Sequence, residues 1–586
     1  MRTTQVEVEK FLKIGLGILI IGIIIVATAL GAYYTTTPLK GELIVDLWYE
    51  STGHYPQSAD QAAVFKAQLE KTGLITVNLH SADWASYGAE SETGKMPVAL
   101  WGWTADLNDP DEFVYGLLYS EGSSWLGAGY SNPEMDRLIT ESRTATDLAQ
   151  RAQLYHQIQE LSLKDAPVIP LYQGKIWAVT KPDITGVEFG QPTPQVYFWL
   201  IDPPPGKDTL IIGTTDTIDV NLDPAEDYSS STSRILPMLG SPLVMVKPGA
   251  SGDPGDFIPV LATKFSSSPD GLTWTFDLRE GVKFSDGSEF TADAAKYSFD
   301  RSMTLNTPYG AIAMFGYNEI IANVEAPSKY QLVLTLKHPC PWFLWLMSLA
   351  SSQFVNPKSV PKDRVLNYVE GDLKASNPND LGPYVLTEWL RQAGKDVELK
   401  LDANPNYYAA ADGLPKTKHI IYKFYSDPTS LALAMKAGEI DMAFKQLTST
   451  DVKAFQSDPN FKVWSHRAAF IQYMVFNVKT PPFDNPKVRQ AIVAAIDRAE
   501  LCKTVFGGMA DPLYSLVPNG YIFHEDTFKT LESQGKDFTI STLQELGYSE
   551  TSVNPASQTW LALVGVGVIV AVVGIAMLLR RKTSNP

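Results

Sequence analysis

Apolar and polar residues follow two different periods along this chain. Alternation of apolar and polar positions, typical of half-buried strands, occurs at 75–79, 274–278 and 330–336, and 43–49 is a short apolar run of strand length. Apolar residues recur with helical spacing at 61–72, 147–164, 485–496 and 541–546. Because strands and helices are mixed from one end of the chain to the other, without a short repeat, the pattern predicts an α/β fold.

Two of the expected helices carry signals at their ends. Ser58 and Gln61 have the spacing of a capping box, and Gly73 follows the same helix where a left-handed residue is favoured. Asn485 and Pro486 are suited to the cap and the first position of the helix that they open. These signals predict where the two helices begin and where the first one ends.

An uncharged apolar run lies near each end of the chain, at 14–34 and at 560–579. Each has about the 20 residues that a membrane-spanning helix needs. Basic residues lie outside both runs, before the first and after the second, which predicts that both termini are cytoplasmic and that residues 40–555 lie outside the cell membrane. A cleaved signal peptide is the alternative for the first run, although 21 apolar residues are many for one.

Composition excludes several functions. The 586 residues carry 48 Lys and Arg against 65 Asp and Glu, a net charge of −17, so the basic surface that nucleic-acid binding requires is not expected. Two cysteines cannot form a zinc cluster, and we expect no metal and no cofactor. No common catalytic motif occurs, so we expect no catalytic residues. The acidic group Asp106, Asp109, Asp111 and Glu112 lacks the glycine of a calcium loop and is interpreted as a solvated turn.

Several motifs together resemble the extracellular solute-binding proteins of peptide-type ABC importers, the family of dipeptide- and oligopeptide-binding proteins. The segments that carry the resemblance are 102–113 (GWTADLNDPDEF), 130–136, 166–173, 209–224 (TLIIGTTDTIDVNLDP), 257–301, 381–386, 404–408, 438–442 and 482–498. Each segment is weakly specific, but together they extend over most of the chain with compatible spacing.

The order of these segments is permuted relative to the family. The segments from 102 to 173 resemble the family's C-terminal part, yet they come first, and the family's opening begins only at Thr209. The proline-rich segment 202–207 (DPPPGK) would then join the family's usual ends. We interpret the order as a circular permutation, with a mis-assembled gene as the alternative. A permutation predicts that the chain lies close to itself near Lys40 and Glu550, so that the two anchors emerge side by side.

The resemblance implies an α/β fold of two lobes around a cleft, the periplasmic-binding-protein-like or Venus flytrap fold, with an additional domain. The predicted division is 41–175 with 470–550 for one lobe, 176–230 with 374–469 for the second lobe, and 231–373 for the additional domain. Ligand binding would close the lobes, because a ligand that bridges them favours the closed state.

The resemblance also implies ligand-binding residues. Asp106 matches the family carboxylate that receives the amino group of a peptide, and Trp103 matches an aromatic residue of the cleft. Gly102 and Thr104 flank Trp103 and are candidates for backbone contacts with an extended ligand. Weaker candidates from the opposite lobe are Tyr228, Ser229 and Ser230. Structural roles remain open for each: Asp106 as a turn cap and Trp103 as a core residue.

Three functions follow as expectations. The first is a membrane-anchored receptor that captures peptides and delivers them to an ABC permease with cytoplasmic ATPases. The second is the same receptor for oligosaccharides. Some peptide binders of the family have an arginine where this chain has Leu100, and its absence argues against short peptides with a fixed C-terminus. The resemblance also implies oligosaccharides as possible ligands, which tryptophan rings could stack on. The third, from another class, is an anchored extracellular hydrolase.

Overall fold

The structure is a computed structural model that describes residues 40–550, except 53, 191–194, 219–221, 227–231, 248–253, 308–309, 367–379 and 446. Within these described residues, no helix is both long and apolar enough to cross a membrane. The two predicted anchors, 14–34 and 560–579, lie outside the described residues.

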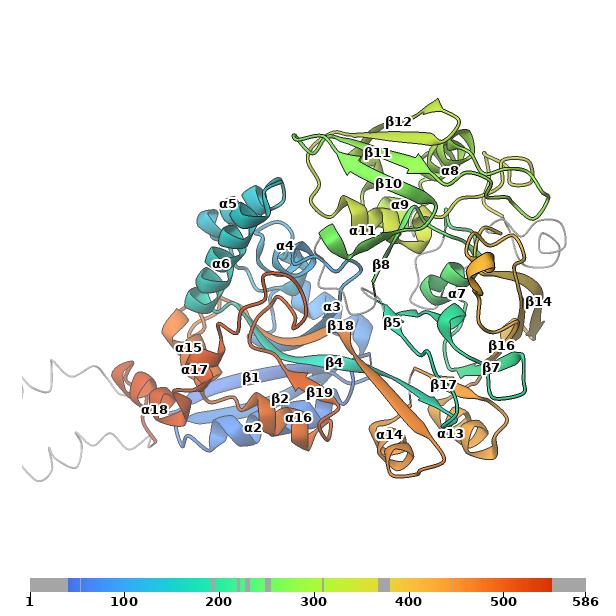
Figure 1. Ribbon diagram of the computed structural model, residues 1–586. Coiled ribbons are helices and arrows are strands. Elements are labelled where there is room, and N and C mark those ends of the chain that lie inside the picture. Colours follow the sequence, from blue (N-terminus) through green and yellow to red (C-terminus); the bar gives the residue numbers. More distant parts are fainter. Residues whose placement is uncertain are drawn as a thin grey trace, which may run out of the picture.

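One eleven-stranded sheet extends through most of the molecule (Figure 1). Its strand order is β14-β15-β16-β7-β17-β4-β18-β3-β1-β2, and β19 pairs with β4 beside this path. The strands are β14 (Tyr384–Gln392), β15 (Lys395–Ala403), β16 (His419–Phe424), β7 (Thr209–Thr214), β17 (Met442–Phe444), β4 (Val168–Thr180), β18 (Lys462–Phe476), β3 (Val98–Thr104), β1 (Leu43–Glu50), β2 (Ile75–Ala82) and β19 (Ala510–Pro512). Strands from both ends of the chain therefore share one sheet.

A separate four-stranded antiparallel sheet lies at the top of Figure 1. It has the order β10-β11-β13-β12, made of β10 (Ala262–Ser267), β11 (Thr273–Leu278), β13 (Gln331–Leu336) and β12 (Ile321–Ser328). Two small pairs complete the strands: β5 (Phe189–Gly190) with β6 (Gln195–Val196), and β8 (Val244–Val246) with β9 (Phe257–Pro259). Two sheets joined by helices give the mixed α/β class that the sequence predicts.

Helices cover both sheets. Around the left part of the large sheet in Figure 1 are α2 (Ser58–Glu70), α3 (Trp84–Glu92), α4 (Asp111–Leu118), α5 (Pro133–Ser142), α6 (Leu148–Asp165), α15 (Pro486–Ala494), α16 (Arg498–Thr504), α17 (Lys529–Glu532) and α18 (Gly535–Glu545). The remaining helices are α7 (Thr232–Leu239), α8 (Ala292–Leu305), α9 (Ala311–Met314), α10 (Tyr317–Ile320), α11 (Phe343–Ser348), α13 (Pro428–Ala437) and α14 (Ser449–Gln456). The short 3-10 helices are η1 (Ser124–Leu126), η2 (Phe198–Leu200), η3 (Pro254–Asp256), η4 (Ala350–Ser352) and η5 (Ala410–Asp412).

Most of the sequence-predicted elements are present, and one predicted cap is wrong. Asn485 caps α15 through its side chain, with Pro486 at the first position, and Gly73 has the expected left-handed φ of 71°. Ser58 and Gln61 do not form a capping box: α2 begins at Ser58 without a side-chain cap. The Gln61 amide is instead fully buried and donates to the carbonyl of Pro56 at 2.6 Å, because a buried amide requires a partner.

The hydrophobic cores join distant parts of the chain. One core combines residues 43–100 and 166–172 with residues 452–548, and a second combines residues 55–168 with residues 469–521. A third core comes from residues 176–239 and 350–468, and a fourth lies almost wholly within residues 243–381. The first two cores could not exist if the early and late parts of the chain were independent bodies.

The two ends of the described chain meet, as the sequence predicts. The backbone N–H of Lys40 donates to the carbonyl of Gly547 at 2.8 Å, and that of Ser549 donates to the carbonyl of Gly41 at 3.0 Å. The Lys40 ammonium also lies 5.0 Å from the centre of the Tyr548 ring. Helix α18 thus ends beside the start of β1.

Candidate functional site

Three parallel strands end at one edge of the large sheet, which we call the carboxyl edge: β1 ends at Glu50, β2 at Ala82 and β3 at Thr104. In α/β sheets, ligands bind in the crevice outside the carboxyl ends of the strands. Asp106 lies two residues beyond β3. The structure therefore brings the predicted residues of 102–106 together at a position suited to ligand binding.

Gly102 is buried and lies in a tight aromatic socket. A Cβ atom at this position would lie 2.7 Å from the Phe470 ring and 2.9 Å from the Tyr55 ring, closer than packed atoms approach. The Gly102 carbonyl accepts a hydrogen bond from the Tyr55 hydroxyl at 3.1 Å. This carbonyl is thus engaged within the protein, whereas Thr104, at the end of the strand, is exposed.

Asp106 lies in a loop that other parts of the fold hold in place. Its backbone N–H donates to the Glu112 carboxyl at 3.2 Å. Its neighbour Leu107 is 4% exposed and belongs to the hydrophobic core made otherwise by residues 243–381. The segment that carries Asp106 is therefore packed between α4 and the domain that contains the four-stranded sheet.

The acidic segment is not the solvated turn that the sequence suggested. Asp109 is 2% exposed and receives two hydrogen bonds from Arg151, at 2.6 and 2.8 Å. Asp111 is 8% exposed and lies 3.4 Å from the Arg143 guanidinium. The interpretation was wrong because these cations come from α6 and from the end of α5, which are close only in the folded chain. No group of His, Cys, Asp or Glu among the described residues is arranged to hold a metal ion.

Burial raises the pKa of two of these carboxyl groups. Burial and, next, the neighbouring Asp106 charge together raise the pKa of Glu112 to about 8, against the backbone hydrogen bond from Asp106. Burial also raises the pKa of Asp111 to about 6, although Arg143 opposes the shift. Glu112 is consequently protonated in most molecules at pH 7.

A continuous row of aromatic rings lines the carboxyl edge. Trp84 stacks on His54 with 3.6 Å between ring centres, and contacts Trp101 at 5.7 Å. Trp101 contacts Trp125 at 5.2 Å, and Trp125 contacts Trp103 at 5.5 Å. Trp84 is 38% exposed, so one end of the row faces solvent. Trp103 is half-buried in this row rather than wholly in the core.

Two long antiparallel strands connect the parts of the large sheet on either side of this edge. β4 and β18 pair from Lys462 opposite Thr180 to Val475 opposite Val168, with irregular register between Arg467 and Ile471. At the irregularity, Phe470 packs against three of the hydrophobic cores. Phe470 therefore lies where three of the hydrophobic cores meet.

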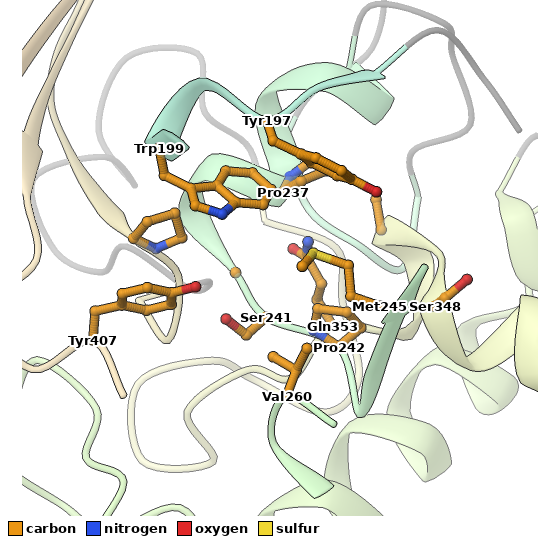
Figure 2. A pocket seen from close by; sticks show the side chains of 13 residues that line it. Tyr197, Trp199, Pro237, Ser241, Pro242, Met245, Val260, Ser348, Gln353 and Tyr407 are labelled. Carbon is orange, nitrogen blue, oxygen red and sulfur yellow. The ribbon is translucent and has the colours of Figure 1, made fainter. Parts of the chain in front are cut away.

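The predicted residues of the opposite lobe, Tyr228, Ser229 and Ser230, lie outside the described residues. A separate cavity is lined by Tyr197, Trp199, Met245, Gln353 and Tyr407 (Figure 2). Its volume of about 30 Å³ is room for about two water molecules, so it does not accept a peptide in this conformation.

Sequence reasoning missed several residues of the carboxyl edge. Tyr55, Trp84 and Trp125 were not identified, and Glu112 was included only in the supposed solvated turn. The first two directly follow strands β1 and β2, and the rule that ligands bind beyond carboxyl ends could have found them. The sequence contains no signal for Phe470, because its position depends on the pairing of β18 with β3.

Comparison with known proteins gives consistent relatives. The family described as bacterial extracellular solute-binding proteins, family 5 Middle, matches residues 32–125 and 256–552, more than half of the chain. Glutathione-binding protein GsiB of Escherichia coli is 30% identical over 259 residues, which cover 44% of this chain and 47% of the relative. Di/tripeptide-binding protein 2 of Pseudomonas aeruginosa is 28% identical over 331 residues, 54% of this chain and 59% of the relative. The matched region thus spans about half the length of these relatives.

Solved structures of similar proteins match at lower identity. The periplasmic murein tripeptide-binding protein MppA, in an unliganded open form, is 19% identical, with a TM-score of 0.44 over 61% of this chain and 67% of that chain. OppA of Haemophilus influenzae, in complex with the peptide RPPGFSPFR, is 20% identical, with a TM-score of 0.39 over 59% of this chain and 67% of that chain.

Proposed function

This chain belongs to the bacterial extracellular solute-binding proteins of family 5, and we propose that it captures peptides for an ABC importer and is anchored to the cell membrane at both ends. Proteins of this family bind solutes and are not enzymes, which removes the hydrolase alternative. The observation that carries the proposal is the position of Asp106 at the carboxyl edge, beside the paired strands β4 and β18.

The chemistry of this edge suits a peptide. A carboxylate pairs well with the ammonium group at the start of a peptide, and a partly buried position strengthens the hydrogen bonds. The names of two relatives give glutathione and di- or tripeptides as their ligands, all of which carry a free amino group. Closure of the two lobes about β4 and β18 would enclose the ligand, and the closed form would then dock on a permease.

Titration of the tryptophan fluorescence of the full chain tests the ligand class. The panel contains di-, tri- and oligopeptides and a set of oligosaccharides, because the aromatic row from Trp84 to Trp103 could also stack on sugar rings. We expect a saturable response to peptides. A response to sugars alone would replace peptides by oligosaccharides as the ligand, and a response to neither would contradict capture of both.

Replacement of the carboxylate tests the residue. Asp106→Asn should weaken peptide binding about 10- to 100-fold, because a hydrogen bond to a charged group contributes about 1.5–3 kcal/mol. The matched control is Asp60→Asn, an exposed position on α2, which should leave the affinity unchanged. Equal affinity of the wild-type and Asp106→Asn proteins would remove Asp106 from the site.

We also propose that the chain is a circular permutation of the family's order, divided into the two lobes and additional domain given above. Support comes from the meeting of Lys40 with Gly547 and from β18, a late strand that lies between the early strands β3 and β4. The anchors at 14–34 and 560–579 would then leave the same lobe side by side and tether it close to the membrane.

Cleavage of the connecting segment tests the permutation. A protease site inserted into 202–207 should be cut without separating the two fragments, because two of the cores contain residues from both. We expect the cut protein to elute as one species in gel filtration and to keep its peptide affinity. Dissociation of the fragments under native conditions would contradict the permuted assembly.

A further inference from the structure

We infer that Glu112 is a second carboxyl group of the amine-binding site and gives up its proton when a ligand ammonium binds. The Tyr521 hydroxyl then donates a hydrogen bond to the carboxylate that forms. The inference rests on the proposed function, because it needs a ligand with an amino group beside Asp106. It adds a residue that sets the pH dependence of capture and the preference for a cationic end.

Glu112 lies directly against the residue proposed to hold the amine. Its Oε2 atom accepts the backbone N–H of Asp106 at 3.2 Å, so the second carboxyl group is fixed at the start of the Asp106 loop. Glu112 is half-buried in the first turn of α4, so its contact with water is limited. The two carboxyl groups are close enough for the charge of Asp106 to oppose ionisation of Glu112.

The cations near this cluster are paired with other acids. Arg151 donates two hydrogen bonds to Asp109, and Arg143 lies beside Asp111. In the part of the chain that the structure describes, no lysine, arginine or histidine lies within ion-pair distance of Glu112. A buried acid without a cation is held in its neutral form, and a cation brought by a ligand would favour the ionised form.

The buried hydroxyl of Tyr521 is a second, independent feature that points to a ligand. Its side chain is 4% exposed, and its ring packs edge-on against Phe113 at 5.5 Å. The hydroxyl lacks a hydrogen-bond partner among the described residues, although buried hydroxyls normally have one. Phe113 directly follows Glu112 in α4, so this ring contact brings Tyr521 close to the acidic cluster. Burial and the charges of Glu112, Asp106 and Asp109 raise the pKa of Tyr521.

The proton balance of binding follows from these positions. In the empty site, Glu112 carries its proton and Asp106 carries the negative charge. A bound ammonium lies beside both groups, the O–H bond of Glu112 breaks, and the proton passes to the solvent. The charged groups that act on Glu112 are the carboxyl groups of Asp106 and Asp109 from the loop and of Asp111 from α4. Arg143 and Arg151 pair instead with Asp111 and Asp109. Binding should therefore strengthen as the pH rises.

Calorimetric titration of the full chain in detergent with the tripeptide Ala-Ala-Ala measures this proton directly. A released proton is taken up by the buffer, and phosphate and Tris differ in their enthalpy of protonation. At pH 7, the binding enthalpy observed in the two buffers should therefore differ by a substantial fraction of that difference. Affinity should rise by up to about tenfold from pH 6 to pH 7, a range in which the peptide amine, with a pKa of about 7.7–8.0, keeps most of its charge. N-acetylated Ala-Ala-Ala should release no proton.

Three variants complete the test. Glu112→Gln should abolish the proton release and flatten the pH dependence, while the exposed Glu121→Gln should behave as the wild type. Tyr521→Phe removes only the unpartnered hydroxyl, so the fold should persist while the release at pH 7 decreases. Wild-type binding without proton release, or release that persists in Glu112→Gln, would overturn the inference and leave peptide capture intact. Failure of the wild type to bind any peptide would overturn both.

Discussion

Two buried acids in different regions of the molecule have opposite environments. Asp223, beyond β7, is fully buried, and Arg301 on α8 donates to both of its oxygens at 2.7 and 2.9 Å. The backbone N–H of Leu366 adds a third hydrogen bond at 2.8 Å. Glu112, at the carboxyl edge, accepts one backbone N–H and has no cation within ion-pair distance among the described residues.

The difference indicates which acids hold the fold together and which are available to a ligand. A buried charge is costly unless it is paired and hydrogen-bonded, and Asp223 meets both conditions within the protein. Asp109 does so as well, although it lies only three residues from Glu112. Neighbouring acids in one segment can therefore differ in whether a cation pairs with them. Glu112, the acid without a cation, is the one beside Asp106, the proposed amine-binding residue.

The largest effect should follow loss of the cation in the paired region. Arg301→Met leaves Asp223 buried without its partner, which should lower the free energy of unfolding by about 3–5 kcal/mol. The midpoint of urea unfolding measures the change. The control is Arg137→Met, whose exposed ion pairs on α5 should contribute little to stability. Similar effects of the two substitutions would show that burial does not distinguish these ion pairs.

A smaller effect of opposite sign should follow removal of the acid at the carboxyl edge. The pKa of Glu112 is about 8 in the folded protein and about 4.3 in the unfolded chain, so its contribution to stability is complete below pH 4 and is lost as the pH rises toward 8. Glu112→Gln avoids this loss. We expect a gain of about 1–2 kcal/mol at pH 7, since Glu112 is only half-buried and solvent reduces the full difference.

Thermal unfolding of Glu112→Gln and of the wild type at pH 4, 7 and 8 measures this gain. The two proteins should unfold together at pH 4 and diverge at higher pH, with the variant more stable by a few degrees. A variant that is less stable than the wild type at pH 8 would show that the Glu112 carboxylate stabilises the empty protein, and the contrast with Asp223 would fail.

Much of the local structure could be predicted from the sequence. Alternation at 75–79 and 330–336 predicted β2 and β13, and Asn485 with Pro486 predicted the start of α15, because these features depend on neighbouring residues. The motif around Trp103 and Asp106 directed attention to the carboxyl edge. The capping box failed because the Gln61 amide donates to the Pro56 carbonyl and to the Tyr172 hydroxyl, which lies 111 positions away. The solvated turn failed because Asp109 pairs with Arg151, 42 positions away.

The sequence by itself determined the α/β class, the negative charge, the two apolar runs at the ends and the identity of the candidate carboxylate. Only the tertiary structure decided that Glu112 lies against Asp106 without a cation, that Tyr521 packs against the neighbouring Phe113, and that Phe470 fills the space above Gly102. Local periodicity reports which face of an element is buried. The ionisation of a carboxyl group depends instead on charges and solvent within a few ångströms, and these come from parts of the chain that only folding brings together.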